Sequence, residues 1–187
     1  MKQIDADPKI EAPAAGTASP VIRHVTCKTA LNQSTISEYS LNCYVGCTHA
    51  CAYCYARYMQ RFHPHVEPWG GFVDVKTNAV EALEKQLRKA RPGPVFVSSA
   101  CDGWQPVEEQ YRLTRECCRL LLDAGFRVNA LTKSARILRD FDVFQGMDAR
   151  LRYVDLPGRV AAGDLGAPCV IGRRPVPGIA RRSGSGY

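Results

Sequence analysis

The chain is organised around one cysteine-rich stretch, Cys47-Thr48-His49-Ala50-Cys51-Ala52-Tyr53-Cys54. Three cysteines follow a CxxxCxxC spacing, and a fourth, Cys43, lies four residues upstream. Thiolates at this density are typical ligands of an iron–sulfur cluster or of zinc. Structural zinc sites usually combine two separated ligand pairs, and no second CxxC or HxxxH pattern follows here. The spacing favours a four-iron cluster with three protein ligands, whose fourth iron is open to a small molecule.

The sequence around this stretch resembles the radical S-adenosylmethionine (SAM) superfamily, and within it the spore photoproduct lyase-like branch. Three ordered blocks between about Val25 and about Asp148 carry the resemblance: LNCYVGCTHACAYCYAR at 41–57, DGWQPVE at 102–108 with LTR at 113–115, and LTKS at 131–134 with LRD at 138–140. The resemblance implies that Cys47, Cys51 and Cys54 hold the cluster and that Cys43 is outside the ligand set. Gly46 and Ala50 are small, which we expect to let the backbone wrap closely around a cluster.

The resemblance also implies a reaction. A reduced [4Fe–4S] cluster cleaves SAM to methionine and a 5′-deoxyadenosyl radical, which abstracts a hydrogen atom from the substrate. The cofactors implied are the cluster and SAM, and the partner implied is a one-electron reductant such as a flavodoxin or ferredoxin. Damaged DNA is one candidate substrate, because the lyase of this branch acts on a thymine dimer of spore DNA. The protein itself supplies positioning and water exclusion.

Four further residues are assigned to the site by the resemblance. Tyr53, Ser99 and Lys133 are the expected cofactor contacts. A lysine can pair with the carboxylate of SAM, and a serine hydroxyl can bond to its amino acid or ribose. Cys101 is the candidate hydrogen-atom donor, because lyases of the branch use a cysteine on this part of the barrel. Each residue also has a plain structural interpretation, such as ring packing, helix capping or an inert buried thiol.

Other classes of function stay open. One is a non-catalytic iron–sulfur or zinc-binding module, in which Cys43 or His49 would supply the fourth ligand. Another is an inactive fragment of a radical SAM enzyme. A DNA-binding protein without chemistry ranks last. The formal charge is +7, but seven Arg against three Asp after residue 145 supply four of these charges and leave only +3 elsewhere.

Apolar periodicity and turn formers predict alternating strands and helices. Helices are expected at 55–59, 78–90, 106–124 and 134–144, strands at 39–44, 95–100 and 126–132, and a loop over 60–76. This order predicts βαβ units and a parallel sheet, with the motifs at the carboxyl ends of its strands. The expected fold class is α/β. By resemblance, it is the N-terminal part of a partial (β/α)6 barrel with roughly three βα units.

Composition divides the chain into three parts. Residues 1–20 lack an apolar period and are expected to form a disordered arm, residues 21–148 the radical SAM core, and residues 149–187 a basic, irregular tail rich in Gly, Arg and Pro. A short strand at 153–156 is expected within the tail. Because the later strands of the family barrel have no counterpart, we expect a chain truncated or frame-shifted near residue 148. Sequencing the coding region and its downstream DNA would test this.

The sequence also indicates in which cellular compartment the protein is expected. A run of about 18 apolar residues and a basic-then-apolar leader are both missing, so neither a membrane partner nor export is expected. Nine cysteines without an export signal fit metal ligation in a reducing cytoplasm better than a disulfide framework.

Overall fold

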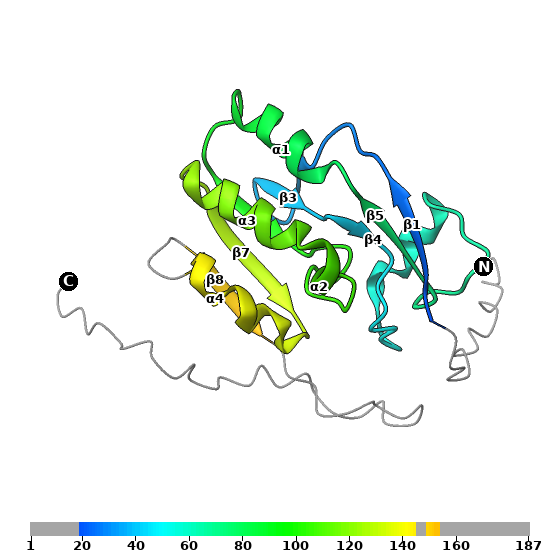
Figure 1. Ribbon diagram of the computed structural model, residues 1–187. Coiled ribbons are helices and arrows are strands. Elements are labelled where there is room, and N and C mark those ends of the chain that lie inside the picture. The colour runs from blue at the N-terminus through cyan, green and yellow to red at the C-terminus, as the bar shows by residue number, and fades with distance from the viewer. Residues whose placement is uncertain (1–18, 145–148, 154–187) are drawn as a thin grey trace, which may run out of the picture.

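The computed structural model describes residues 19–144 and 149–153, and a mostly parallel sheet forms the centre of this part (Figure 1). Its parallel strands lie side by side in the order β3 (Tyr39–Leu41), β6 (Pro94–Val97), β7 (Arg127–Thr132) and β8 (Ala149–Tyr153). The short strand β2 (Leu31–Gln33) pairs antiparallel with β3 at the other edge. The strands at 95–100 and 126–132 are thus confirmed to within about three residues. Within the described residues the sheet stays open, so the architecture is mixed α/β and a barrel is not confirmed.

A second sheet holds β1 (Val21–Val25), β5 (Phe72–Lys76) and β4 (Tyr44–Val45), with β5 in the middle. The prediction of a loop over 60–76 is therefore wrong for its last five residues. Phe72, Val73 and Val75 are buried as in a core strand, but Asp74 interrupts the apolar run. Asp74 is buried as well, because its Oδ2 lies 2.9 Å from Nε2 of His65. An aspartate that is buried beside a histidine nine residues away thus interrupts the apolar pattern by which the strand would be recognised.

Two helices cover one face of the central sheet. α1 (Ala79–Leu87) and α3 (Leu113–Asp123) lie side by side in Figure 1. α3 buries Leu113, Cys117 and Leu121, which recur every four residues and so share one side of the helix. The helix expected at 78–90 is confirmed as α1, and its first turn follows Asn78 as predicted.

The helix expected over 106–124 is divided into α2 (Glu108–Tyr111) and α3. Between them, Arg112 has a left-handed φ of 51°. The cause is the fully buried Glu108, whose carboxylate accepts hydrogen bonds from the backbone N–H groups of Thr114 (3.1 Å) and Arg115 (3.0 Å). These N–H groups begin α3 and would otherwise lack partners. The interruption between the two helices lets the buried carboxyl group of Glu108 cap α3, the longer of the two.

Two further helical segments are tighter than expected. A 3-10 helix, η1 (Tyr55–Arg61), follows the cysteine stretch, and a second, η2 (Ala135–Asp140), leads into α4 (Phe141–Phe144). The predicted cap of the latter is confirmed, since Oγ of Ser134 accepts a hydrogen bond from the N–H of Arg136 at 3.3 Å. None of the helices in the described part of the chain has the length and apolar character needed to cross a bilayer.

The predicted boundary between core and tail coincides with the start of a strand. β8 pairs in parallel with β7 along its whole length, from Val128 opposite Ala149 to Thr132 opposite Tyr153. The strand expected at 153–156 therefore lies four residues earlier in the chain. The rest of the predicted tail and nearly all of the predicted arm fall outside the described residues.

Candidate functional site

Three segments meet at the carboxyl ends of the parallel strands: the cysteine loop (residues 46–54), the turn after β6 (residues 98–105), and the end of β7. Gln105 joins the first two, because its Oε1 accepts from the N–H of Thr48 at 3.0 Å and its Nε2 donates to the Gly46 carbonyl at 3.2 Å. Lys133 joins the cysteine loop to β7. The prediction that these motifs share one end of the sheet is confirmed.

The Lys133 ammonium lies directly against the cysteine loop. Its Nζ is 3.1 Å from Sγ of Cys51 and 2.6 Å from the hydroxyl of Tyr53, and it stands 4.1 Å from the centre of the Tyr53 ring. Burial lowers the pKa of Lys133, but its contacts with Tyr53 and Cys51 outweigh burial and raise that pKa overall. A positive charge therefore stays beside the candidate ligand Cys51. Tyr53 itself is 55% exposed, so its ring is open to a ligand.

Asp102 holds the three segments together. Its Oδ1 accepts hydrogen bonds from the N–H of Trp104 (2.9 Å) and the hydroxyl of Thr132 (2.6 Å), and its Oδ2 accepts from the N–H of Lys133 (2.8 Å). Nε2 of His49, from the cysteine loop, lies 3.4 Å from the same Oδ2. Burial raises the pKa of Asp102, but His49 and the hydrogen bonds bring that pKa below its ordinary value. The carboxylate is therefore an ionised anchor for the site.

Asn42, which sequence reasoning did not single out, organises the turn after β6. Its Nδ2 donates to Oγ of Ser99 (2.9 Å), and its Oδ1 accepts from the N–H of Ala100 (2.9 Å) and lies 3.9 Å from Sγ of Cys101. Nζ of Lys76 donates to the Asn42 carbonyl at 2.8 Å. A polar residue directly after β3, inside the motif, was the available signal. Asn42 thus fixes both Ser99 and Cys101 relative to the strand that leads to the cysteines.

Replacing Asn42 with alanine should lower the free energy of unfolding by about 1–3 kcal/mol, because it removes two hydrogen bonds to half-buried partners, the Ser99 hydroxyl and the Ala100 N–H. Urea denaturation measures this loss. The matched control is Asn32→Ala, since Asn32 is exposed and bonds only to Thr29 and the nearby Ala30 carbonyl. Its cost should stay within about 0.5 kcal/mol. Equal costs for the two variants would contradict the organising role of Asn42.

Cys47 and Cys101 are buried thiols at this end of the sheet. Burial raises the pKa of Cys47 to about 12, although backbone N–H groups of Asp102 and His49 partly offset it. Burial also raises the pKa of Cys101 well above its usual range, and nearby Cys47 adds to the effect. Both groups therefore hold their protons at neutral pH. A metal bound at Cys47 has to displace that proton, because the thiolate is the ligand form.

The three candidate ligands fit an iron–sulfur cluster in kind. Cys47 is buried, whereas Cys51 and Cys54 are half-buried, and all three stand in one loop. No three Cys, His, Asp or Glu side chains within residues 19–144 converge on a common point in the arrangement that a metal ion needs. The soft donor set and the neighbouring Lys133 cation suit a cluster of negatively charged sulfides. The loop would have to draw its thiols together to hold one.

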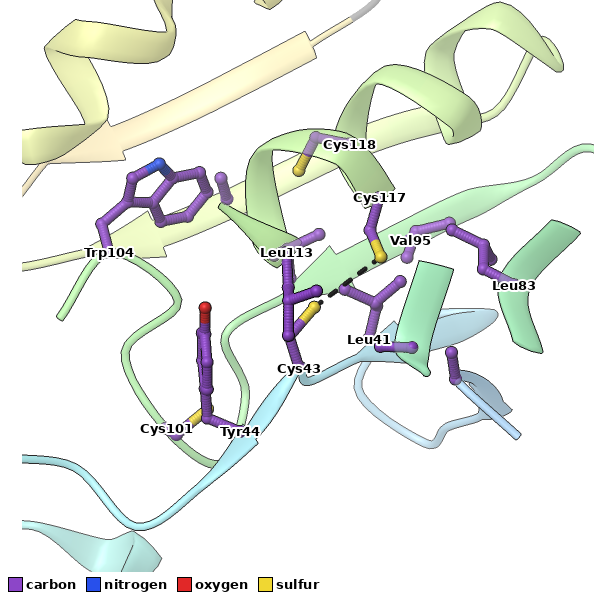
Figure 2. Packing of buried hydrophobic residues seen from close by; sticks show 14 of the residues in the cluster. Leu41, Cys43, Tyr44, Leu83, Val95, Cys101, Trp104, Leu113, Cys117 and Cys118 are labelled. Atoms are coloured by element: carbon purple, nitrogen blue, oxygen red, sulfur yellow. Dashed lines mark hydrogen bonds between the residues drawn. The ribbon is translucent and has the colours of Figure 1, made fainter. Parts of the chain in front are cut away.

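Cys43 faces away from this site. Figure 2 shows its side chain pointing toward Cys117 of α3, with the two Sγ atoms 3.8 Å apart in the core. Contact with Cys117 and burial raise the pKa of Cys43 well above its usual range. Cys43 is thus a core thiol in the structure, as the resemblance implied.

The small residues of the cysteine loop also have a packing reason, beside the predicted one of wrapping around a cluster. Gly46 has a left-handed φ of 85°, and a Cβ there would lie 2.8 Å from the ring carbon Cδ2 of Phe72 and collide with the Phe72 carbonyl oxygen. Ala50 packs so closely on Gly70 that a Cβ on Gly70 would come within 2.5 Å of the Ala50 Cβ. These residues are small because the loop packs tightly on the β5 region.

Comparison with known proteins identifies relatives over part of the chain. No family model matches. An uncharacterized protein of Methanocaldococcus jannaschii is 34% identical over 123 residues, which cover 65% of this chain and 46% of that protein. An uncharacterized protein of Mycobacterium bovis is 34% identical over 127 residues, which cover 62% of this chain and 37% of that protein. The chain spans less than half the length of these curated relatives.

Solved structures with a similar fold are those of spore photoproduct lyase. A variant with bound S-adenosylmethionine and dinucleoside spore photoproduct has a TM-score of 0.53 at 13% identity, over 71% of this chain and 39% of the lyase. A single-site variant of the lyase has a TM-score of 0.52 at 13% identity, over 81% of this chain and 45% of the lyase. At such identities the likeness concerns the fold alone. The chain therefore shares its α/β fold with part of spore photoproduct lyase.

Proposed function

We propose that this chain carries the cluster-binding part of a radical SAM enzyme of the spore photoproduct lyase-like kind. Cys47, Cys51 and Cys54 would hold a [4Fe–4S] cluster beside bound SAM. The observation that carries the proposal is the 3.1 Å contact between Nζ of Lys133 and Sγ of Cys51. It supports the proposal because a cation suited to the SAM carboxylate lies against the loop of candidate ligands. When bound, the cluster supplies the electron that cleaves SAM to methionine and a 5′-deoxyadenosyl radical.

The neighbouring residues have groups free for a ligand. Oγ of Ser99 accepts its hydrogen bond from Asn42, so its own hydroxyl proton can be donated to the amino acid or ribose of SAM. The exposed ring of Tyr53 offers a flat apolar face. Lys133 can exchange its contact with the Tyr53 hydroxyl for the carboxylate of SAM. Position and hydrogen-bonding capacity support these three proposed roles.

Cys101 suits the role of hydrogen-atom donor. A donor of this kind must hold its hydrogen until the substrate radical forms, and burial keeps the Cys101 thiol protonated. Its sulfur lies at the end of β6, fixed near Oδ1 of Asn42. We propose that Cys101 donates a hydrogen atom to the substrate radical at this end of the sheet, and that one electron from the flavodoxin- or ferredoxin-type reductant and one proton then restore its thiol.

Low-temperature EPR of the anaerobically reconstituted, reduced protein tests the proposal. A [4Fe–4S]⁺ signal that changes on adding SAM is expected, because the fourth iron is open to the ligand. A cluster signal indifferent to SAM would favour a fully ligated electron-transfer centre. Stoichiometric zinc in place of iron would favour the structural zinc module. Either of these two results would overturn the radical SAM proposal.

Substrate and reductant are further proposals. Since one of the solved lyase structures contains dinucleoside spore photoproduct, this damaged dinucleoside is the first substrate to test. The reconstituted protein would be incubated with it, SAM and a flavodoxin- or ferredoxin-type reductant. Appearance of 5′-deoxyadenosine together with repaired dinucleoside would support the assignment. Appearance of 5′-deoxyadenosine without repair would indicate that the enzyme acts on another substrate.

Replacing Lys133 with methionine should weaken SAM binding roughly 10- to 100-fold, because one charge-assisted hydrogen bond contributes about 1.5–3 kcal/mol. Titration of the EPR signal with SAM measures the dissociation constant. Lys133→Arg should retain most of the affinity, and Arg88→Met, which removes an exposed cation just after α1, should not change it. Iron content should stay constant in all three variants. Unchanged SAM affinity in Lys133→Met would remove this residue from the cofactor site.

A further inference from the structure

A groove of about 520 Å³ lies between α1 and the segment 27–33. None of its lining residues belongs to the cysteine loop or to the carboxyl ends of β6 and β7. Its apolar part is formed by Leu31, Tyr39 and Ala82, and three lysines, Lys28, Lys85 and Lys89, also line it. No acidic residue is among the described residues that line it. The size falls within the range of about 300–1,000 Å³ that small-molecule sites occupy. We call it the lysine groove.

The wall of the lysine groove is held in place by two amide side chains of the α1 region. Asn78 accepts from the N–H of Cys27 (2.8 Å) and donates to its carbonyl (2.9 Å). Gln86 accepts from the N–H groups of Ala30 (2.8 Å) and Leu31 (2.9 Å) and donates to the Leu31 carbonyl (2.7 Å). These five hydrogen bonds fix segment 27–31 against the helix, so the groove exists before any ligand binds.

The side chains of Asn78 and Gln86 are neutral, so the charge of the groove lining comes from its three lysines. Among residues 19–144, no ion pair includes Lys28, Lys85 or Lys89. Lys85 lies in the last turn of α1 and Lys89 two residues beyond the end of that helix, and both line the groove. Lys28 adds a third charge from the clamped segment. An anion bound between the three lysines would lower their mutual repulsion.

We propose that the lysine groove binds a phosphorylated small molecule of about nucleotide size. Lysines act as point charges for phosphate groups, and three of them match a diphosphate or triphosphate better than a single carboxylate. The half-buried ring of Tyr39 suits the uncharged body of such a ligand. This site is separate from the cysteine loop and does not depend on the proposed radical chemistry.

Isothermal titration calorimetry of the full chain with inorganic pyrophosphate and with ATP tests the proposal. The double variant Lys85→Gln/Lys89→Gln should weaken binding of both probes at least about ten-fold, by the loss of charge-assisted contacts. The matched control is Arg88→Gln/Arg91→Gln, which removes two exposed charges from the same region but none from the groove. The control should bind as the parent does. Thermal unfolding of both double variants verifies that the fold is retained.

Three outcomes would overturn the proposal. One is no measurable binding of either probe. Another is equal weakening in the lysine and arginine double variants, which would indicate nonspecific attraction to positive charge. The third is tighter binding of single-stranded oligothymidylate than of ATP, with the same dependence on Lys85 and Lys89, which would assign these lysines to a nucleic-acid backbone instead.

Discussion

Replacing Cys51 with alanine is expected to abolish assembly of the four-iron cluster. With three protein ligands and one open iron, the proposed site has no spare thiolate, so two remaining cysteines would leave two irons without protein ligands. His49 does not compensate, because its Nε2 lies against Oδ2 of Asp102. Iron and sulfide should fall from about four of each per chain to near zero after anaerobic reconstitution.

The matched control for this experiment is Cys43→Ala. Cys43 lies only four residues before Cys47, yet its sulfur is in the core beside Cys117 (Figure 2). This variant should keep its iron and lose only about 1 kcal/mol of stability, as expected for removing one buried atom. Full iron content in Cys51→Ala, or equal iron loss in the two variants, would contradict the assigned ligand set.

The parts of the fold that the sequence predicts are those with local causes. α1 follows from apolar spacing between Asn78, which directly precedes the helix, and the Pro92-Gly93-Pro94 stop. β6 and β7 follow from short apolar runs after such breakers. Their parallel pairing then brings the ends of the two strands together. For these elements, periodicity and turn formers carry sufficient information.

The elements that sequence reasoning missed depend on distant partners. The apolar pattern of β5 is interrupted by Asp74, which is buried beside His65. β1 is mostly exposed and is held in place by parallel pairing with β5. The division of the helix at Arg112 follows from Glu108 capping α3, a contact that no local propensity encodes. Each case depends on a contact between separate elements or segments rather than on local propensity.

The candidate site divides in the same way. The cysteine spacing is a local pattern, so the ligand candidates are evident from the sequence. Asn42 and Asp102 act across segments, and Asp102 contacts residues up to 53 positions away in the chain, at His49. The contact between Lys133 and Cys51 likewise joins residues 82 positions apart. The sequence identifies Lys133 as a candidate, but only the folded structure shows that it lies beside Cys51.

Gly46→Ala is expected to cause the largest loss of stability among the single substitutions considered. The left-handed backbone at φ 85° costs an alanine roughly 1–2 kcal/mol. A Cβ would also collide with the Phe72 carbonyl oxygen and approach its ring carbons to 2.8 Å, and relieving such overpacking costs about 1–3 kcal/mol more. Phe72 is fully buried in β5 and cannot move aside. Urea denaturation should therefore give a loss of about 2–5 kcal/mol.

Gly125→Ala separates the two causes. Gly125 also has a left-handed φ, of 79°, but a Cβ there meets nothing within 4 Å. Its loss should be the backbone cost alone, about 1–2 kcal/mol, so the difference between the variants isolates the collision with Phe72. Because Gly46 directly precedes Cys47 and its carbonyl accepts from Gln105, Gly46→Ala should also lower iron loading, whereas Gly125→Ala should not. Equal stability losses in the two variants would mean that the cysteine loop is not pressed against β5, and the geometry proposed for the site would have to be abandoned.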